Sequence, residues 1–246
     1  MSRNLVRRVG SKLRGVGARA VALVHERRQA TLYGMTQPCP RRGGEFEVRR
    51  SPVPPPGDPL FEAMFRTGHG LNHAEARRLS TDARSWVYHL WDGATLVDFI
   101  CLSGAVRLVE ELDLRITPAL DAAWVFCGWT APTHRGRGLF QQCLATIVND
   151  VFDEGGASLW VEVLNTNAAS QTGTTRMGFQ PVADLRWART LGRSTQSAQL
   201  LVDNDLARQI RAMDAVWLPA GEAVVWLPVA PDQVSQSSSP SSISAS

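Results

Sequence analysis

The chain has 246 residues, of which 44% are hydrophobic and 20% are charged, and its formal net charge is +3. This content suits one sizeable domain with extensions, and no apolar run reaches the roughly 18 residues that a membrane-spanning helix needs. The charge is unevenly distributed, because residues 1–44 carry +9 and the remainder carries −6. The sequence therefore predicts a basic arm ahead of an acidic globular domain.

The basic arm, expected over residues 1–34, has the pattern of an amphipathic helix between residues 3 and 28. Apolar side chains from Leu5 to Val24 fall on one face, away from the basic ones. Three glycines would each cost about 1 kcal/mol inside a helix, so this helix needs a surface on which to fold. An anionic membrane surface is one candidate. Docking on the acidic domain, disorder and an organelle transit peptide are the alternatives.

The cysteines and histidines give no sign of a metal site. The four cysteines lack metal-type spacing, and the five histidines form no cluster with acids or cysteines. Three of the cysteines lie inside apolar segments, which is typical of free core thiols in a reducing compartment. We therefore expect a cytoplasmic protein without a metal, and the four thiols are Cys39, Cys101, Cys127 and Cys143.

The hydrophobic pattern predicts one domain over residues 45–230, after a linker over 35–44 and before a disordered Ser-rich tail over 231–246. Its clearer elements are a strand at 46–50, helices at 58–65 and 74–79, hairpin strands at 85–90 and 95–103, a strand at 122–130, a helix at 141–152 and a strand at 159–164. Weaker signals predict strands at 182–190, 198–202 and 223–227 and a helix at 205–213. Residues 106–120 are expected to be a charged connection and a lip of the active site.

A short glycine-rich turn follows the buried strand at 122–130. Gly136 and Gly138 let the backbone turn tightly, so that several N–H groups face one point. The N-terminus of the next helix adds a partial positive charge, and Arg135 and Arg137 add full ones. The turn therefore predicts a phosphate pocket, although it is neither a P-loop nor a Rossmann fingerprint.

This turn and a second stretch downstream resemble the GNAT acetyltransferase family. Arg135 and Gly138 match the first two fixed positions of the family's acetyl-CoA signature, Arg/Gln-x-x-Gly-x-Gly/Ala, and Phe140 replaces its last Gly or Ala. The family's later motif is matched by Asn167 and by Arg176-Met177-Gly178-Phe179, with Thr174 where the family usually has Tyr. The resemblance covers roughly residues 45 to 190. It implies an α/β fold with a mixed, largely antiparallel central sheet flanked by helices.

The resemblance also implies acetyl-CoA as cosubstrate, held between two central strands that splay apart. Gly128 and Thr130 would bind the pantetheine arm. Asn167 would bond the arm or cap the following helix, the cap being favoured. The Phe140 side chain would crowd the pyrophosphate or point into the core, and the phase of the helix favours the core. The pyrophosphate would be held by the backbone amides of Arg135, Gly136, Arg137, Gly138, Leu139 and Phe140.

Acetyl transfer to an amine requires that the amine lose a proton and that the leaving thiolate be stabilised. Glu162 is the first candidate for the base, because strand alternation places it between Trp160 and Leu164 on one face. Its alternative role is an exposed residue of that face. Thr174 and Ser170 are weak proton donors, and a thiolate can leave unassisted. Other acids on neighbouring connections are Glu110, Glu111 and Asp121.

The leading hypothesis is an acetyl-CoA-dependent N-acetyltransferase that transfers directly to an unidentified amine. The acidic domain suits a cationic acceptor, whereas an amino sugar or a membrane-linked precursor suits the basic arm better. The alternative is a degenerate GNAT domain that binds acyl-CoA as an interaction module, which Phe140 and Thr174 favour. Nucleic-acid binding through the arm ranks last, because neither aromatic interleaving nor a known motif supports it.

Overall fold

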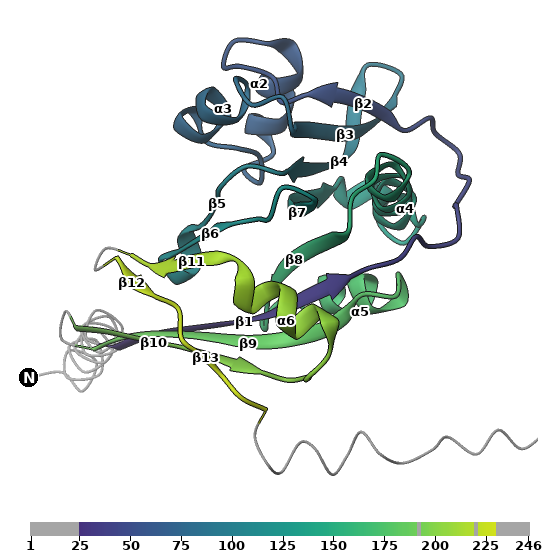
Figure 1. The fold of residues 1–246 in the computed structure, drawn as a ribbon. Helices are drawn as coiled ribbons and strands as arrows, with labels where there is room; N and C mark the ends of the chain where they lie inside the picture. Colours follow the sequence, from purple (N-terminus) through teal and green to yellow (C-terminus); the bar gives the residue numbers. More distant parts are fainter. Residues whose placement is uncertain (1–24, 191–192, 219–220, 230–246) are drawn as a thin grey trace, which may run out of the picture.

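The computed structural model describes residues 25–190, 193–218 and 221–229 (Figure 1). Its first half contains β1 (His25–Met35), β2 (Arg49–Pro52), α2 (Pro59–Arg66), α3 (His73–Leu79), β3 (Ser85–Asp92), β4 (Thr95–Ser103), β5 (Arg107–Val109), η1 (Glu110–Leu112) and β6 (Leu114–Thr117). The second half contains β7 (Ala122–Thr130), η2 (Pro132–His134), α4 (Leu139–Asp153), β8 (Ser158–Leu164), α5 (Ala168–Arg176), β9 (Gln180–Thr190), β10 (Arg193–Leu200), α6 (Asp205–Ala212), β11 (Asp214–Trp217), β12 (Glu222–Ala223) and β13 (Trp226–Leu227).

The described strands form two sheets. The main sheet has the order β13-β10-β9-β1-β8-β7-β4-β3-β2, and the small sheet has the order β12-β11-β6-β5. Most neighbours are antiparallel; the exceptions are the parallel pairs β7–β8 and β10–β13. The expected fold class is therefore confirmed: a mixed, largely antiparallel central sheet flanked by helices.

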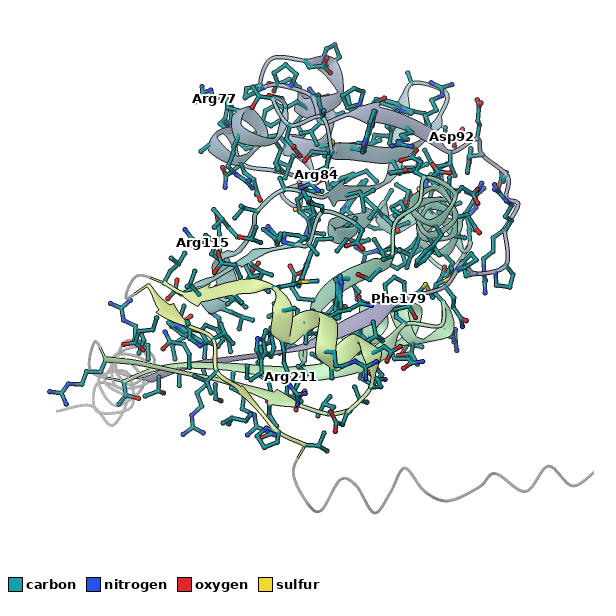
Figure 2. All side chains as sticks on the ribbon, viewed as in Figure 1. Arg77, Arg84, Asp92, Arg115, Phe179 and Arg211 are labelled. Carbon is teal, nitrogen blue, oxygen red and sulfur yellow. The ribbon has the colours of Figure 1, made fainter. Side chains whose placement is uncertain are left out.

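Two hydrophobic clusters cover the two faces of the main sheet. On one face, the buried side chains of α4 pack against Tyr88, Ile100 and Val161, and the cluster continues to Phe179, labelled in Figure 2. On the other face, α2, α3, α6 and the small sheet contribute to a cluster centred on Trp124 and Trp160. Figure 1 shows α4 and α5 on one side of the strands and α6 on the other. Functional groups near the centre of the sheet can therefore lie under either layer.

Local signals place the central elements correctly. The Asp58 side chain accepts a hydrogen bond from the N–H of Leu60 and caps α2. The Asp-Gly step joins β3 to β4, where Gly93 has φ +57°. α4 begins at Leu139, directly after the glycine-rich turn. These signals are local, so they are visible in the sequence without knowledge of the tertiary contacts.

The predicted N-terminal boundary of the domain is wrong. Residues 25–34, assigned from the sequence to the basic arm, lie in β1, which pairs with both β8 and β9 in the middle of the sheet. The adjacent Arg27 and Arg28 obscure the hydrophobic pattern of this strand. Its burial depends on β8 and β9, which lie more than 100 residues away in the sequence. Of the helix expected over residues 3–28, the last four residues lie in β1 and the rest lies outside the described residues, as does the tail expected over 231–246.

Other differences also arise from long-range pairing. The strand expected at 46–50 is β2, at Arg49–Pro52. The expected connection over 106–120 contains β5, η1 and β6, and β11 follows α6 without a sequence signal. β5, β6 and β11 pair with one another in the small sheet. Strands this short show too few alternations to be recognised one at a time.

The central position of β1 predicts a large effect of Leu32→Ala on stability. Leu32 is fully buried, so its truncation should lower the free energy of unfolding by about 2–5 kcal/mol in urea denaturation. Val225→Ala is the control, because Val225 is 71% exposed and should change that free energy by less than about 0.5 kcal/mol. Equal, small effects of both changes would show that residues 25–34 do not belong to the folded domain.

Candidate functional site

The two central parallel strands part at their C-terminal ends. β7 and β8 pair from Ala122–Ser158 to Val125–Val161, and no further pair between them follows, although both strands continue. β7 stays paired with β4 but carries one extra residue between Phe126 and Trp129. Such a bulge bends a strand, and here Cys127 has φ +49°. We call the opening between residues 126–130 of β7 and 162–164 of β8 the wedge.

Two cavities meet at the wedge. The first, the sheet cavity, has a volume of about 450 Å³ and is bounded by β5, η1, β7, β8 and α5. The second, the loop cavity, has a volume of about 660 Å³ and is bounded by the turn after β7 and the beginnings of α4 and α5. The residues that line both, and so mark their junction, are His69, Gly128, Phe140, Asn167 and Ser170.

Backbone N–H groups at the start of α4 face the loop cavity. Gly136 and Gly138 have φ +79° and +78° and turn the chain into the helix. The Gln142 N–H donates to the Gly138 carbonyl at 2.9 Å, the first such bond of the helix. The N–H groups of residues 139–141 therefore have no partner within α4, and these residues line the cavity. A helix N-terminus of this kind binds anions.

Basic side chains line the same cavity. Arg42, Arg135, Arg176 and His134 line it. The Arg135 Nε donates to the Thr130 carbonyl at 3.2 Å, which holds this side chain beside the end of β7. The cavity therefore combines free N–H groups with three arginines, and this combination suits a ligand with several phosphates.

Arg137 points away from the loop cavity. Its guanidinium pairs with Glu45 and lies 5.3 Å from the centre of the Phe46 ring. Only Arg135 of the two arginines in the predicted phosphate turn therefore lines the cavity. The turn has the expected backbone, but the Arg135 side chain faces the loop cavity whereas the Arg137 side chain pairs with Glu45.

The end of β7 is fixed by a buried acid on β4. The Thr130 hydroxyl donates to Asp98 Oδ1 at 2.5 Å, and Asp98 is fully buried. Burial raises the pKa of Asp98 to about 6, although hydrogen bonds from Thr130 and Cys143 act to lower it. Asp98 thus holds the Thr130 side chain, and the Thr130 backbone carbonyl accepts the hydrogen bond from Arg135.

Glu162 forms part of a buried charge network in the sheet cavity. Its Oε1 accepts from Arg107 at 3.0 Å, and its Oε2 accepts from the Trp124 indole N–H. Arg107 also pairs with Glu75 at 3.0 Å. Burial acts to lower the pKa of Arg107, but Glu162 and Glu75 outweigh it and raise that pKa. The Glu162 carboxylate therefore lies on the predicted face of β8 with both oxygens engaged.

Other polar groups enter the sheet cavity from connections. Glu110 and Glu111 of η1 are exposed and line it, and Glu110 accepts from the Asn72 side chain at 3.3 Å. His69, in the loop between α2 and α3, is exposed at the junction. Thr174 lines the cavity from α5 but is only 1% exposed. The cavity wall is therefore rich in acids, with one imidazole at its entrance.

A family model described as the acetyltransferase (GNAT) family matches residues 49–179, more than half of the chain. The chain belongs to the GNAT acetyltransferase family. β1, which completes the central sheet, lies outside the matched residues. The family assignment agrees with the signature residues Arg135 and Gly138 and with the parted strands.

Solved structures with a similar fold include GNAT proteins from bacteria. One, described as an acetyltransferase of this family from Novosphingobium aromaticivorans, has 17% identity and a TM-score of 0.48, with 69% of this chain and 66% of that chain covered. A GCN5-related N-acetyltransferase from Sphaerobacter thermophilus has 13% identity and a TM-score of 0.49, with 72% and 56% covered. The chain thus spans less than two thirds of their lengths. No curated protein matches the sequence.

The structure gathers most of the sequence-predicted residues of this GNAT domain at the two cavities. Glu162 and Thr174 line the sheet cavity. Asn167 does cap α5, accepting from the Ser170 N–H at 3.1 Å, and it also lines the junction. Asp121 lines neither of the two cavities. The predicted cofactor residues that line the loop cavity are Gly128, Thr130, Arg135, Gly136, Gly138, Leu139, Phe140 and Asn167.

The expectations for two residues of the GNAT domain need correction. Cys127 was expected in the core, but it is partly exposed and lines the sheet cavity, because the bulge turns it out of the β7 alternation. Phe140 was expected to point into the core, and its half-buried side chain does pack against the core, but it also lines both cavities. The sequence also missed Arg42, His69 and His134 as cavity residues, since no motif marks them.

Within the described residues, no group of three or more potential metal ligands is present. No helix in that part of the chain is long and apolar enough to cross a membrane.

The buried Asp98 predicts a pH-dependent difference between the natural protein and Asp98→Asn. Its folded pKa of about 6 lies above the ordinary value of 3.8, so its stabilising contribution is complete below pH 4 and is lost as the pH rises through 6. When the pH rises from 4 to 8, the free energy of unfolding of Asp98→Asn should therefore increase by up to about 3 kcal/mol relative to that of the natural protein. Urea denaturation at both pH values measures this. A pH-independent difference would contradict the raised pKa.

Proposed function

We propose that this GNAT protein is an acetyl-CoA-dependent N-acetyltransferase that transfers the acetyl group directly to an amine. One observation carries the proposal: the wedge joins an anion-binding cavity to an acid-lined cavity at a single junction. Acetyl-CoA has phosphates at one end and a thioester at the other, and a protonated amine is attracted by acids. The two cavities therefore suit the two substrates, and the junction suits the thioester.

In this proposal the nucleotide end of acetyl-CoA lies in the loop cavity. The pyrophosphate accepts hydrogen bonds from the free N–H groups of residues 139–141 and from Arg135. Arg42 and Arg176 line the same cavity and are available for the remaining phosphate. The pantetheine arm then follows β7 past Gly128, where the backbone facing β8 has no strand partner.

The acceptor lies in the sheet cavity, whose charge favours a cation. Its wall contains four acids and one arginine, a formal charge of −3 without histidine: Glu75, Glu110, Glu111, Glu162 and Arg107. Two of the acids are neutralised in part by Arg107, whereas Glu110 and Glu111 are exposed. A primary amine with further positive charge is the acceptor class that this wall supports best.

We assign acceptance of the amine proton to His69. The imidazole is at the junction and makes no hydrogen bond with a side chain of the described residues, and imidazole accepts protons near neutral pH. Glu162, the sequence-based candidate, has both oxygens engaged, so we assign it the role of holding Arg107 and attracting the ammonium group. The amine nitrogen then attacks the thioester carbon, the C–S bond breaks, and the thiolate of CoA leaves beside Ser170.

A second candidate function is acyl-CoA binding without transfer. The observation that favours it is the position of the Phe140 ring at the junction, together with the engaged oxygens of Glu162. The two functions differ in one measurable property, which is the release of free CoA thiol when amines are added. A panel of polyamines, amino sugars and amino acids, assayed with a thiol reagent, separates them.

The cofactor site predicts different effects of two neighbouring arginines. Arg135→Ala should weaken acetyl-CoA binding by about tenfold, because it removes a charged group from the phosphate cavity. Arg137→Ala is the matched control and should change the dissociation constant by less than about twofold, because its side chain pairs with Glu45. Titration calorimetry on the full chain measures both. Equal losses would place the phosphates elsewhere on the turn.

The proposed base predicts a selective loss of rate. His69→Ala should lower kcat by about a hundredfold or more with little change in acetyl-CoA affinity. Glu162→Gln should chiefly raise the KM for the amine, because it weakens the charge network in the acceptor wall. A normal rate for His69→Ala with a large kcat loss for Glu162→Gln would return the role of base to Glu162. No thiol release with any amine would favour the second function.

A further inference from the structure

The Phe140 ring stands across the wedge. A Cβ built on Gly128 of β7 would lie 2.9 Å from Phe140 Cε2. A Cβ built on Gly173 of α5 would lie 3.5 Å from Phe140 Cε1, on the other edge of the ring. The ring therefore lies between β7, which forms one wall of the wedge, and α5, the helix that follows β8. It fills the position where the family signature has Gly or Ala.

Gly128 leaves space for this ring. Gly128 is not among the described glycines with positive φ, so its backbone conformation does not require a glycine. Space favours one, since a Cβ at this position would lie 2.9 Å from Phe140 Cε2 and the ring would have to shift. Gly128 and Phe140 are thus complementary in shape at the place where the two cavities meet.

The ring has room to move aside. Phe140 is only half-buried and is the second residue of α4, so its side chain packs at the rim of the core. Its neighbours at the junction include two glycines, which offer no side chain to hold it. Cavities of about 450 and 660 Å³ lie on either side. Rotation about the side-chain torsions can therefore move the ring away from Gly128 without a backbone change.

We propose that Phe140 controls access of the pantetheine arm to the sheet cavity. The inference rests on the proposed function and adds an order of events to it. The nucleotide end of CoA binds first in the loop cavity, which is open. The ring then turns out of the junction, and the arm enters along Gly128 with the ring against it. Phe140 therefore affects the association rate of ligands that carry the pantetheine arm, and it does not affect that of ligands without the arm.

The test compares CoA with 3′,5′-ADP, which has the adenosine and two of the three phosphates of CoA but lacks the arm. Association and dissociation rates of both ligands are measured by stopped-flow fluorescence on the full chain. Phe140→Ala should raise the association rate of CoA by about tenfold or more and leave that of 3′,5′-ADP within about twofold. Phe152→Ala is the matched control, because it removes a half-buried phenylalanine from the same helix at the end remote from both cavities.

Two further variants keep the test decisive. Phe140→Leu removes the planar ring but retains an apolar side chain, and it should give an intermediate CoA rate if Phe140→Ala fails to fold. Gly128→Ala should slow CoA association, and the double variant Gly128→Ala with Phe140→Ala should restore it, because the clash needs both side chains.

The outcomes separate the two proposals. A CoA rate that neither Phe140 variant changes, with normal 3′,5′-ADP binding, would overturn the role of Phe140 and leave the cofactor site in place. The same would follow if both ligands changed by the same factor. Failure of the unchanged protein to bind either ligand would overturn the proposed function itself.

Discussion

The parting of β7 and β8 after Val125 and Val161 is the constraint on which the whole site depends. The two strands separate inside the sheet rather than at its rim, because β4 holds the far edge of β7 and β1 holds the far edge of β8. The wedge therefore exposes backbone groups in the middle of a packed domain, where such groups need a partner. The polar arm of a cofactor can supply it. This is the physical link between the bulge at Cys127 and the proposed binding of acetyl-CoA.

The strand that holds β8 in place comes from outside the residues that the family model matches. β1 pairs with β8 from Ala30 to Met35, and the Thr31 hydroxyl lies 3.1 Å from both Asn165 Oδ1 and Asp184 Oδ1, donating to one of them. Asn165 directly follows β8, so this contact fixes the end of the strand that forms one wall of the wedge. The strand β1 thus helps to shape the wedge, and its Arg27 and Arg28 lie at the far end of the same strand.

Features that depend on local chemistry were predictable from the sequence. Gly136, Gly138 and the apolar helix after them identify the glycine-rich turn and the start of α4, because tight turns and helix starts depend on neighbouring residues. Features that depend on tertiary contacts were not. β1 needs two distant partners, and His69 and Arg42 reach the cavities from segments without any motif. The direction of the Phe140 side chain depends on the parting of the strands, which the periodicity of α4 does not contain.

Hydrogen–deuterium exchange of the full chain, with and without saturating acetyl-CoA, tests the central claim most directly. If acetyl-CoA lies in the wedge, the amides of residues 126–142 should be protected, because they include the unpaired edge of β7 and the free N–H groups of α4. Residues 165–176 should be protected as well, whereas the small sheet should be unchanged. Protection absent from residues 126–142, or confined to another part of the chain, would contradict the account.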